Sequence, residues 1–348
     1  MADQRTTLTS PLPSLQSLRH HRTLWQRRHE LLPIEHSLIE KLVSQWNSSA
    51  RLQQVQPLTG GACNTNLRLV FENHPPLVLR FYVREPTYLH KDRALVPLWK
   101  QAKLPVPALL AWWDEPELPA PCALWEWVEG EPLEEVLTKV SAEEVRVLGR
   151  EVGSLLASLY AVEMPNAGIL GPELSLDPAF DSFPVALVEF ALQCLEGRAR
   201  QRLSTTLYSA VKAGLLTHRT LLEQSEPKIT LVHSDFNGTN MLASKDDEGW
   251  KISALLDWEF ATAGTTLFDL GQMLRYERLF PSEYVQSLTN AFVEGGGRLP
   301  ENWRRICAWM DVVNLCGFLN DVEERPAFFS HVRELLQHTV EEWGADTL

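Results

Sequence analysis

Two short apolar segments in the second half of the chain, each followed at once by polar residues, constrain the fold most strongly. The first leads into LVHSDFNGTNML, which carries His233, Asp235 and Asn240 in the spacing H-x-D-x-x-x-x-N. The second, ISALL, leads into Asp257. Short apolar runs bounded by polar residues are typical of buried strands. The sequence therefore predicts two strands whose ends present these polar side chains.

These residue types suit phosphoryl transfer. A carboxylate such as Asp235 can accept a hydrogen bond from an attacking hydroxyl and orient it toward phosphorus. The amide oxygen of Asn240 can ligate Mg²⁺ beside the phosphates, and Asp257 can bridge that metal to them. Either motif alone is explained equally well by turn residues and a strand cap. Only 17 positions separate Asn240 from Asp257, which favours one shared catalytic site.

Together the motifs resemble the aminoglycoside phosphotransferase family, a superfamily with the protein-kinase-like fold that includes choline, homoserine and methylthioribose kinases. The resemblance extends over about residues 51–275. It implies that Asp235 is the catalytic base and that Asn240 and Asp257 are the magnesium ligands. The family pattern therefore indicates the same roles as the chemistry of the residues.

The resemblance also gives two residues a supporting role. His233 would hydrogen-bond the backbone of the catalytic loop. Asp269, in TTLFDLGQML, matches a family aspartate that braces the loop after the metal-binding aspartate. Neither residue is expected to contact the substrates directly.

A nucleotide site is implied in the first lobe. TGGACN resembles the glycine-containing turn that covers the nucleotide phosphates, which would involve Gly60, Gly61 and Asn64. Cys63 stands where relatives often have Ser. Taken alone, GGACN is better explained by a tight hairpin. The glycines suit either structure, because positive φ and close backbone approach cost glycine little.

The same resemblance places Arg80 on the third strand as a phosphate-binding residue, and a guanidinium can fork two phosphate oxygens. Its usual partner is a glutamate on the following helix. No glutamate stands at the matching place, and Asp92 is the expected substitute. Glu126 and Val128 resemble the hinge between lobes, whose backbone would bind the purine edge.

The order of segments predicts an α+β, two-lobed protein-kinase-like fold, with a small antiparallel β-rich N-lobe and a larger, mostly helical C-lobe. Residues 1–50 would form an N-terminal arm and helix. Residues 51–128 would form the nucleotide-binding lobe, with five strands interrupted by one helix. Residues 129–348 would form the helical lobe with the catalytic loop and metal site.

The overall composition limits the partners. Lys and Arg number 32 against 45 Asp and Glu, a net charge of -13, whereas a nucleic-acid partner would require a basic surface. No apolar run approaches the ~18 residues of a membrane span, and the first residues contain no apolar signal segment. The five cysteines form no C-x-x-C pair, which suits a reducing compartment. We expect a cytoplasmic monomer or homodimer that binds neither nucleic acid nor membrane.

Several enzyme classes lose support. The chain has no G-x-x-x-x-G-K-[ST] motif and no strand-linked G-x-G-x-x-G motif, which argues against Walker-type ATPases and Rossmann dehydrogenases. Ser234 stands where a protein kinase has the arginine that clamps a phosphorylated activation loop. The short distance from Asp257 to the helix expected near Asp269 leaves no room for such a loop.

The predicted function is transfer of a phosphoryl group from ATP or GTP, with Mg²⁺, to a hydroxyl of a small molecule. The alternatives are a catalytically silent nucleotide-binding scaffold of the same fold and an AMP-transferring relative. Acidic residues near the aromatic segments of the helical lobe suggest a cationic acceptor such as an amino sugar or amino alcohol, although a solvated helix face explains any one of them slightly better. These acids are Glu301, Asp311, Asp321, Glu323 and Glu324.

Overall fold

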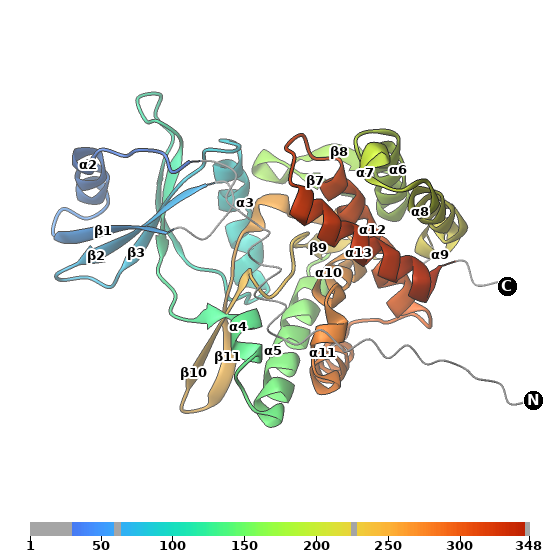
Figure 1. Ribbon diagram of the computed structural model, residues 1–348. Coiled ribbons are helices and arrows are strands. Elements are labelled where there is room, and N and C mark those ends of the chain that lie inside the picture. Colours follow the sequence, from blue (N-terminus) through green and yellow to red (C-terminus); the bar gives the residue numbers. More distant parts are fainter. Residues whose placement is uncertain (1–29, 59–63, 224–227, 345–348) are drawn as a thin grey trace, which may run out of the picture.

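The computed structural model describes residues 30–58, 64–223 and 228–344 (Figure 1). A five-stranded antiparallel sheet forms the first part of the fold, in the order β1-β2-β3-β5-β4. Its strands are β1 (Leu52–Leu58), β2 (Thr65–Phe71), β3 (Leu77–Phe81), β4 (Leu109–Trp113) and β5 (Cys122–Glu126). The sheet occupies one side of the molecule and most of the helices the other (Figure 1).

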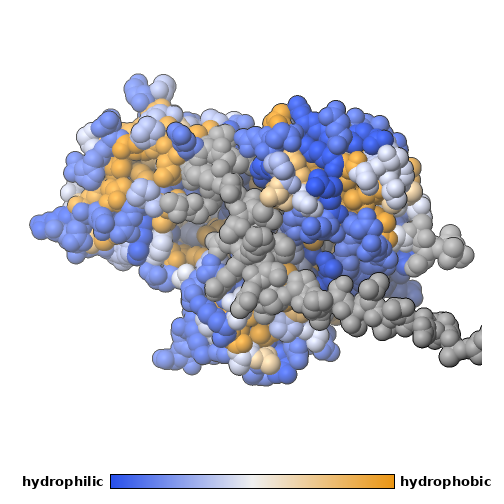
Figure 2. Space-filling model, in the orientation of Figure 1, coloured by the Kyte–Doolittle hydropathy of each residue, from blue (hydrophilic) through white to orange (hydrophobic). Residues whose placement is uncertain are grey.

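Alternating residues determine which face of this sheet is covered. In β2 and β3 every second side chain is buried, among them Leu69 and Leu79, as expected for a pleated strand with one face against a core. Helix α2 (His36–Trp46) covers this face and contributes Ile39 and Leu42 to the shared cluster. Hydrophobic residues remain visible at the surface where α2 meets the sheet (Figure 2).

Helix α3 (Tyr88–Gln101) lies between β3 and β4 in the chain and packs the sheet against the helical part. Its Leu95 and Trp99 belong to the large core cluster that continues through the helical part. Trp99 packs against Trp258, with ring centroids 5.1 Å apart. Trp258 begins the single turn η2 (Trp258–Phe260), which comes directly after Asp257. The helix therefore fixes the sheet against the segment that carries a predicted metal ligand.

The remainder of the chain is mostly helical and contains two small sheets. Strands β11-β10-β6 form one sheet and β8-β7-β12-β9 the other. The helices are α4 (Leu133–Leu137), α5 (Ala142–Tyr160), α6 (Phe183–Glu196), α7 (Ala199–Arg202), α8 (Thr205–Thr217), α9 (Arg219–Glu223), α10 (Thr266–Leu274), α11 (Ser282–Glu294), α12 (Trp303–Leu319) and α13 (Pro326–Trp343). The strands are β6 (Glu131–Pro132), β7 (Ala167–Leu170), β8 (Leu176–Phe180), β9 (Thr230–Val232), β10 (Met241–Asp246), β11 (Gly249–Leu255) and β12 (Thr262–Gly264), with the single turns η1 (Pro172–Leu174) and η3 (Glu277–Leu279).

The α+β organisation predicted from the sequence is observed, including five strands interrupted by one helix in the first part. The strands expected before Asp235 and Asp257 are β9 and β11. Strand β10, which lies between them, was not predicted, because its residues MLASKD become polar after the first three. No helix in the described ranges combines the length and hydrophobicity of a membrane span. The boundaries at residues 50 and 128 stay predictions.

Helices α5 and α11 pack closely at two glycines of α5. A Cβ added to Gly149 would lie 2.6 Å from the carbonyl oxygen of Tyr284, and one added to Gly153 would overlap the carbonyl oxygen of Leu288. Both obstacles are backbone atoms, which cannot rotate away as a side chain can. The contact therefore depends on the absence of side chains at these two positions.

We expect Gly153→Ala to lower the free energy of unfolding by about 1–3 kcal/mol, because the added methyl forces the two helices apart. The measurement is urea unfolding followed by circular dichroism. Gly317→Ala in α12 is the matched control, since its Cβ would meet only the ring of Phe190, which is half exposed and can shift. There the higher helix propensity of alanine should leave stability unchanged or raise it by up to ~1 kcal/mol. Equal losses in both variants would contradict the packing argument.

Candidate active site

The loop between β9 and β10 presents Asp235 at its turn. One carboxylate oxygen of Asp235 accepts a hydrogen bond from the Asn237 amide at 2.7 Å, and the other accepts one from the Asn240 amide at 2.7 Å. Asn240 also donates to the backbone carbonyl of Asp235 at 2.9 Å. Two amides therefore fix the carboxylate within its own loop. The role of Asn237 was not predicted, although its place two residues after an aspartate is a common local hydrogen-bonding position.

Two residues of helix α10, Asp269 and Gln272, form hydrogen bonds that stabilise this loop. The carboxylate of Asp269 accepts the backbone N–H groups of His233 and Ser234, each at 2.8 Å, and Gln272 donates to the carbonyl of Ser234 at 2.9 Å. Ser234 has φ 66°, a left-handed conformation that is strained for a residue with a side chain. These bonds stabilise the strained turn. The expectation that Asp269 braces the loop after Asp257 is wrong, because it bonds the loop that carries Asp235.

His233 is buried and neutral. Its Nδ1 accepts the backbone N–H of Asp235 at 3.2 Å, and its Nε2 donates to the carbonyl of Leu256 at 2.9 Å. One ring nitrogen accepts and the other donates, so the ring carries a single proton. Burial lowers the pKa of His233 to about 4. The predicted hydrogen bonding of His233 to backbone is confirmed, and it joins the ends of β9 and β11.

The burial of neutral His233 predicts a pH-dependent loss of stability. Because its folded pKa lies below the ordinary value of ~6.5, the unfolded chain takes up the proton first as pH falls, so stability decreases below about pH 6.5. Between pH 7 and pH 5 the free energy of unfolding should fall by about 1–2 kcal/mol more in the wild type than in His233→Gln, measured by urea titration. His36→Gln, at an exposed position of α2, is the control and should keep the wild-type difference.

Asp257 and Asn240 lie at adjacent ends of the β10–β11 pair. The Leu256 N–H donates to the Asn240 carbonyl at 2.8 Å, which extends the antiparallel register by one step. Asp257 follows directly, with φ 68°. Its charge, together with burial as the larger cause, raises the pKa of Asp235 to about 6. The structure thus brings together Asp235, Asn240 and Asp257, the three residues that the two sequence motifs supplied.

Oxygen donors at this place suit a magnesium ion. Both hydrogen bonds of the Asn240 side chain use its nitrogen, so its oxygen has no partner within the described chain. One third of the Asp257 side chain is exposed. In the described ranges no group of three or more His, Cys, Asp and Glu side chains is placed to hold a metal ion. In a Mg²⁺ site of this kind the protein typically supplies one or two oxygen ligands, and phosphates and water supply the rest. The residues therefore fit the ion.

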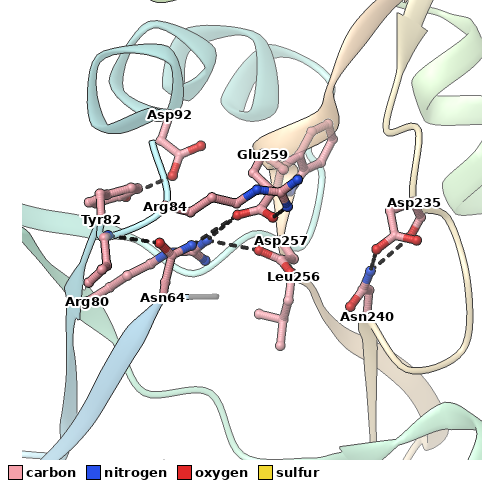
Figure 3. A network of polar contacts seen from close by, with 12 residues as sticks. Asn64, Arg80, Tyr82, Arg84, Asp92, Asp235, Asn240, Leu256, Asp257 and Glu259 are labelled. Carbon is pink, nitrogen blue, oxygen red and sulfur yellow. Dashed lines mark hydrogen bonds and ion pairs between the residues drawn. The ribbon is translucent and has the colours of Figure 1, made fainter. Parts of the chain in front are cut away.

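Arg80 extends from β3 toward the same place (Figure 3). Its Nη2 donates to Asp257 at 2.9 Å and to Glu259 at 3.4 Å. The expected pairing with Asp92 is not observed, since Asp92 accepts the hydroxyl of Tyr82 at 2.8 Å and no ion pair joins it to Arg80 in the part of the chain that is described. Tyr82 lies two residues after Arg80 and takes the place at Asp92 that the arginine was expected to fill.

The predicted phosphate turn is only partly visible. Gly60 and Gly61 lie outside the described residues. Asn64, at the end of this turn, is buried and bonds protein groups on both sides of its amide: it donates to Glu259 at 3.0 Å and accepts the Val83 N–H at 3.2 Å. Its side chain therefore joins the turn to the segment after Asp257.

The predicted hinge follows β5. Glu126 is the last residue of that strand, and its carboxylate accepts the N–H of Ala108 at 3.1 Å. The Trp127 ring lies 4.2 Å from the guanidinium of Arg68 in β2, and its indole donates to Glu129. The N–H of Val128 has no hydrogen-bond partner among the described residues. That donor is free for a ligand at the position where the sequence predicts purine binding.

The acidic residues predicted to attract a cationic acceptor are mostly neutralised by arginines. Asp311 forms a buried two-point pair with Arg275 at 2.6 and 2.8 Å, Asp321 pairs with Arg325, and Glu324 pairs with Arg202. An acid that is already paired gives little attraction to a further cation. These three acids already have arginine partners, whereas Glu301 and Glu323 are exposed, and the cationic acceptor stays a prediction.

The chain matches the model of the phosphotransferase enzyme family over residues 54–309. No curated protein matches it in sequence. Aminoglycoside phosphotransferase APH(4)-Ia has a similar structure, with a TM-score of 0.67 and 17% identity over 90% of this chain and 100% of that chain. So does a putative fructosamine-3-kinase from Thermobifida fusca YX-ER1, with a TM-score of 0.59 and 17% identity over 87% of this chain and 98% of that one.

A third similar structure, APH(2")-IIia in complex with GDP and kanamycin, has a TM-score of 0.65 and 15% identity, over 88% of this chain and 99% of that one. A thermostable mutant of APH(4)-Ia was solved as a ternary complex with ADP and hygromycin B. At these identities the solved structures establish the fold, and the predicted two-lobed, kinase-like α+β class is confirmed.

Proposed function

Because the chain belongs to the phosphotransferase enzyme family, we propose that it transfers the γ-phosphoryl group of ATP or GTP to a hydroxyl group of a small molecule. The observation that supports this most is the convergence of Asp235, Asn240 and Asp257 at the ends of β9, β10 and β11. It provides a hydrogen-bond acceptor for the attacking hydroxyl beside two oxygen ligands for a metal. Phosphoryl transfer depends on this kind of positioning and charge compensation.

Asp235 would act as the base. Its carboxylate would accept a hydrogen bond from the acceptor hydroxyl and direct that oxygen in line with the γ-phosphorus. It would take the proton as the new O–P bond forms and the bond between the γ-phosphorus and the leaving nucleoside diphosphate, ADP or GDP, breaks. A pKa of about 6 leaves the group mostly ionised at neutral pH and still able to take up a proton. The amides of Asn237 and Asn240 keep it in this orientation.

The remaining predicted residues would bind the nucleotide. Asn240 and Asp257 would hold Mg²⁺, which supplies a positive charge to the phosphate oxygens when it is bound. Arg80 would contact the phosphates, since its Nε is a buried donor without a partner in the described chain. Gly60 and Gly61 would supply backbone N–H groups to the phosphates. The Val128 N–H and the backbone of Glu126 would meet the purine edge.

We expect Asp235→Asn to fold and to bind nucleotide nearly as the wild type does, while kcat falls by ~10²–10⁴-fold, because an amide cannot take up the proton. The assay is nucleotide consumption with Mg²⁺ over a panel of hydroxylated metabolites. Amino sugars and amino alcohols come first in the panel, because similar structures contain hygromycin B and kanamycin. Product mass distinguishes a transferred phosphoryl group from a transferred AMP.

The matched control for the base is Asp246→Asn, the same chemical change in an exposed ion pair with Lys251 on the β10–β11 hairpin. Its kcat should equal that of the wild type, since exposed pairs contribute little. An Asp235→Asn variant that retained more than a tenth of the wild-type kcat would remove Asp235 from the role of base.

Asp257→Ala should remove the part of nucleotide binding that depends on Mg²⁺, because the carboxylate that joins metal to phosphate is lost. The measurement is the rise in melting temperature on adding ATP, with and without Mg²⁺. The wild type should show a larger rise with Mg²⁺, and the variant the same rise in both conditions. A wild-type rise that is equal with and without Mg²⁺ would contradict the metal site.

A further inference from the structure

Four residues from the first part of the chain donate hydrogen bonds to Glu259. Its carboxylate accepts the Asn64 amide at 3.0 Å and the Arg80 guanidinium at 3.4 Å through one oxygen, and the Arg84 guanidinium at 3.0 Å through the other (Figure 3). Its backbone carbonyl accepts the ammonium group of Lys91 in α3. The side chain is only 6% exposed. None of the sequence patterns gave this residue a role.

Arg80 has two carboxylate partners, and they differ in what else they can do. Asp257 is the proposed metal ligand, so its carboxylate would be shared with Mg²⁺ when nucleotide and metal bind. Its bond to Arg80 would then be weakened. Asp92 forms no hydrogen bond or ion pair with Arg80 among the described residues: one of its oxygens accepts the Tyr82 hydroxyl, and the other is buried without a hydrogen-bond partner. Among the described residues, Glu259 is the carboxylate besides Asp257 that bonds Arg80, and it would keep this bond with Asp257 on the metal.

Glu259 is also held rigidly with respect to the metal ligand. It follows Asp257 by two residues in the single turn η2. Between them, the buried Trp258 packs against Trp99 of α3 and donates its indole N–H to the Leu255 carbonyl at 3.2 Å. A nearly buried carboxylate is costly unless it is paired, and here two guanidinium groups and an amide compensate it. The arrangement therefore persists independently of the metal.

We propose that Glu259 is a positioning residue for nucleotide binding: it takes the place of the helix acid as the partner of Arg80 and keeps this guanidinium directed at the phosphates while Asp257 ligates the metal. The inference rests on the proposed function. It assigns the arginine's partner to the segment after the metal ligand instead of to α3. Glu259 acts through Arg80 and does not itself touch the transferred group.

The test compares dissociation constants for a non-hydrolysable ATP analogue with Mg²⁺, measured by calorimetry. Glu259→Gln removes the charge but keeps the shape, an oxygen for Asn64 and the carbonyl for Lys91. We expect it to raise Kd, and the KM for ATP, about tenfold, while kcat stays within about threefold of the wild type. Asp246→Asn is the control for the chemical change and should bind as the wild type does.

A double-mutant cycle separates positioning from a purely structural contribution. Arg80→Gln should weaken binding, and adding Glu259→Gln to it should have little further effect, because the guanidinium that Glu259 directs is gone. If the single Glu259 variant does not fold, the double variant and Arg80→Gln still give this comparison. Additive effects of the two changes would overturn the proposal.

Two other results bear on the assignment. An unchanged Kd in Glu259→Gln, or an equal rise in Asp92→Asn, would overturn the role of Glu259 while leaving the proposed function in place. A wild type that binds the analogue neither with nor without Mg²⁺ would overturn the proposed function itself. A rise confined to Glu259→Gln, absent in the Arg80→Gln background, supports the inference.

Discussion

The carboxylate of Asp269 fixes the path of the chain through the active site. By accepting the N–H groups of His233 and Ser234 it stabilises a left-handed turn that would otherwise be unfavourable. Burial raises the pKa of Asp269 to about 7, and the two N–H donors oppose that shift by favouring the ionised form. The orientation of His233, and through it the distance between the ends of β9 and β11, follows from this turn. Asp235 reaches its position in the active site only because these hydrogen bonds stabilise the turn.

The fold also depends on compensating the negative charge of Asp257 and Glu259, which lie where the two parts of the chain meet. Asp257 and Glu259 lie close together, and two guanidinium groups from the first part, those of Arg80 and Arg84, reach them. Such paired groups are expensive to bury and expensive to break, so they fix how the sheet meets the metal segment. The same contacts that hold the two parts together also position the residues proposed to bind phosphate. Stability and function are therefore coupled at Glu259.

The sequence predicts what local patterns determine. Asp235, Asn240 and Asp257 were predicted because each follows a short apolar strand at a recognisable spacing. The partner of Arg80 could not be predicted in this way, because Glu259 lies 179 positions further along the chain and no local rule connects them. The pairing of Asp311 could not be predicted for the same reason, because its arginine, Arg275, stands 36 positions away, directly after the end of α10.

The most direct test of this account is a crystal structure with a non-hydrolysable ATP analogue and Mg²⁺. The account predicts a carboxylate oxygen of Asp257 and the amide oxygen of Asn240 at about 2.0–2.1 Å from the ion, and Arg80 within hydrogen-bonding distance of both the phosphates and Glu259. Asp235 should face the γ-phosphate from the side open to an acceptor. A complex in which Asp257 stays bonded to Arg80 and the ion is held elsewhere would contradict it.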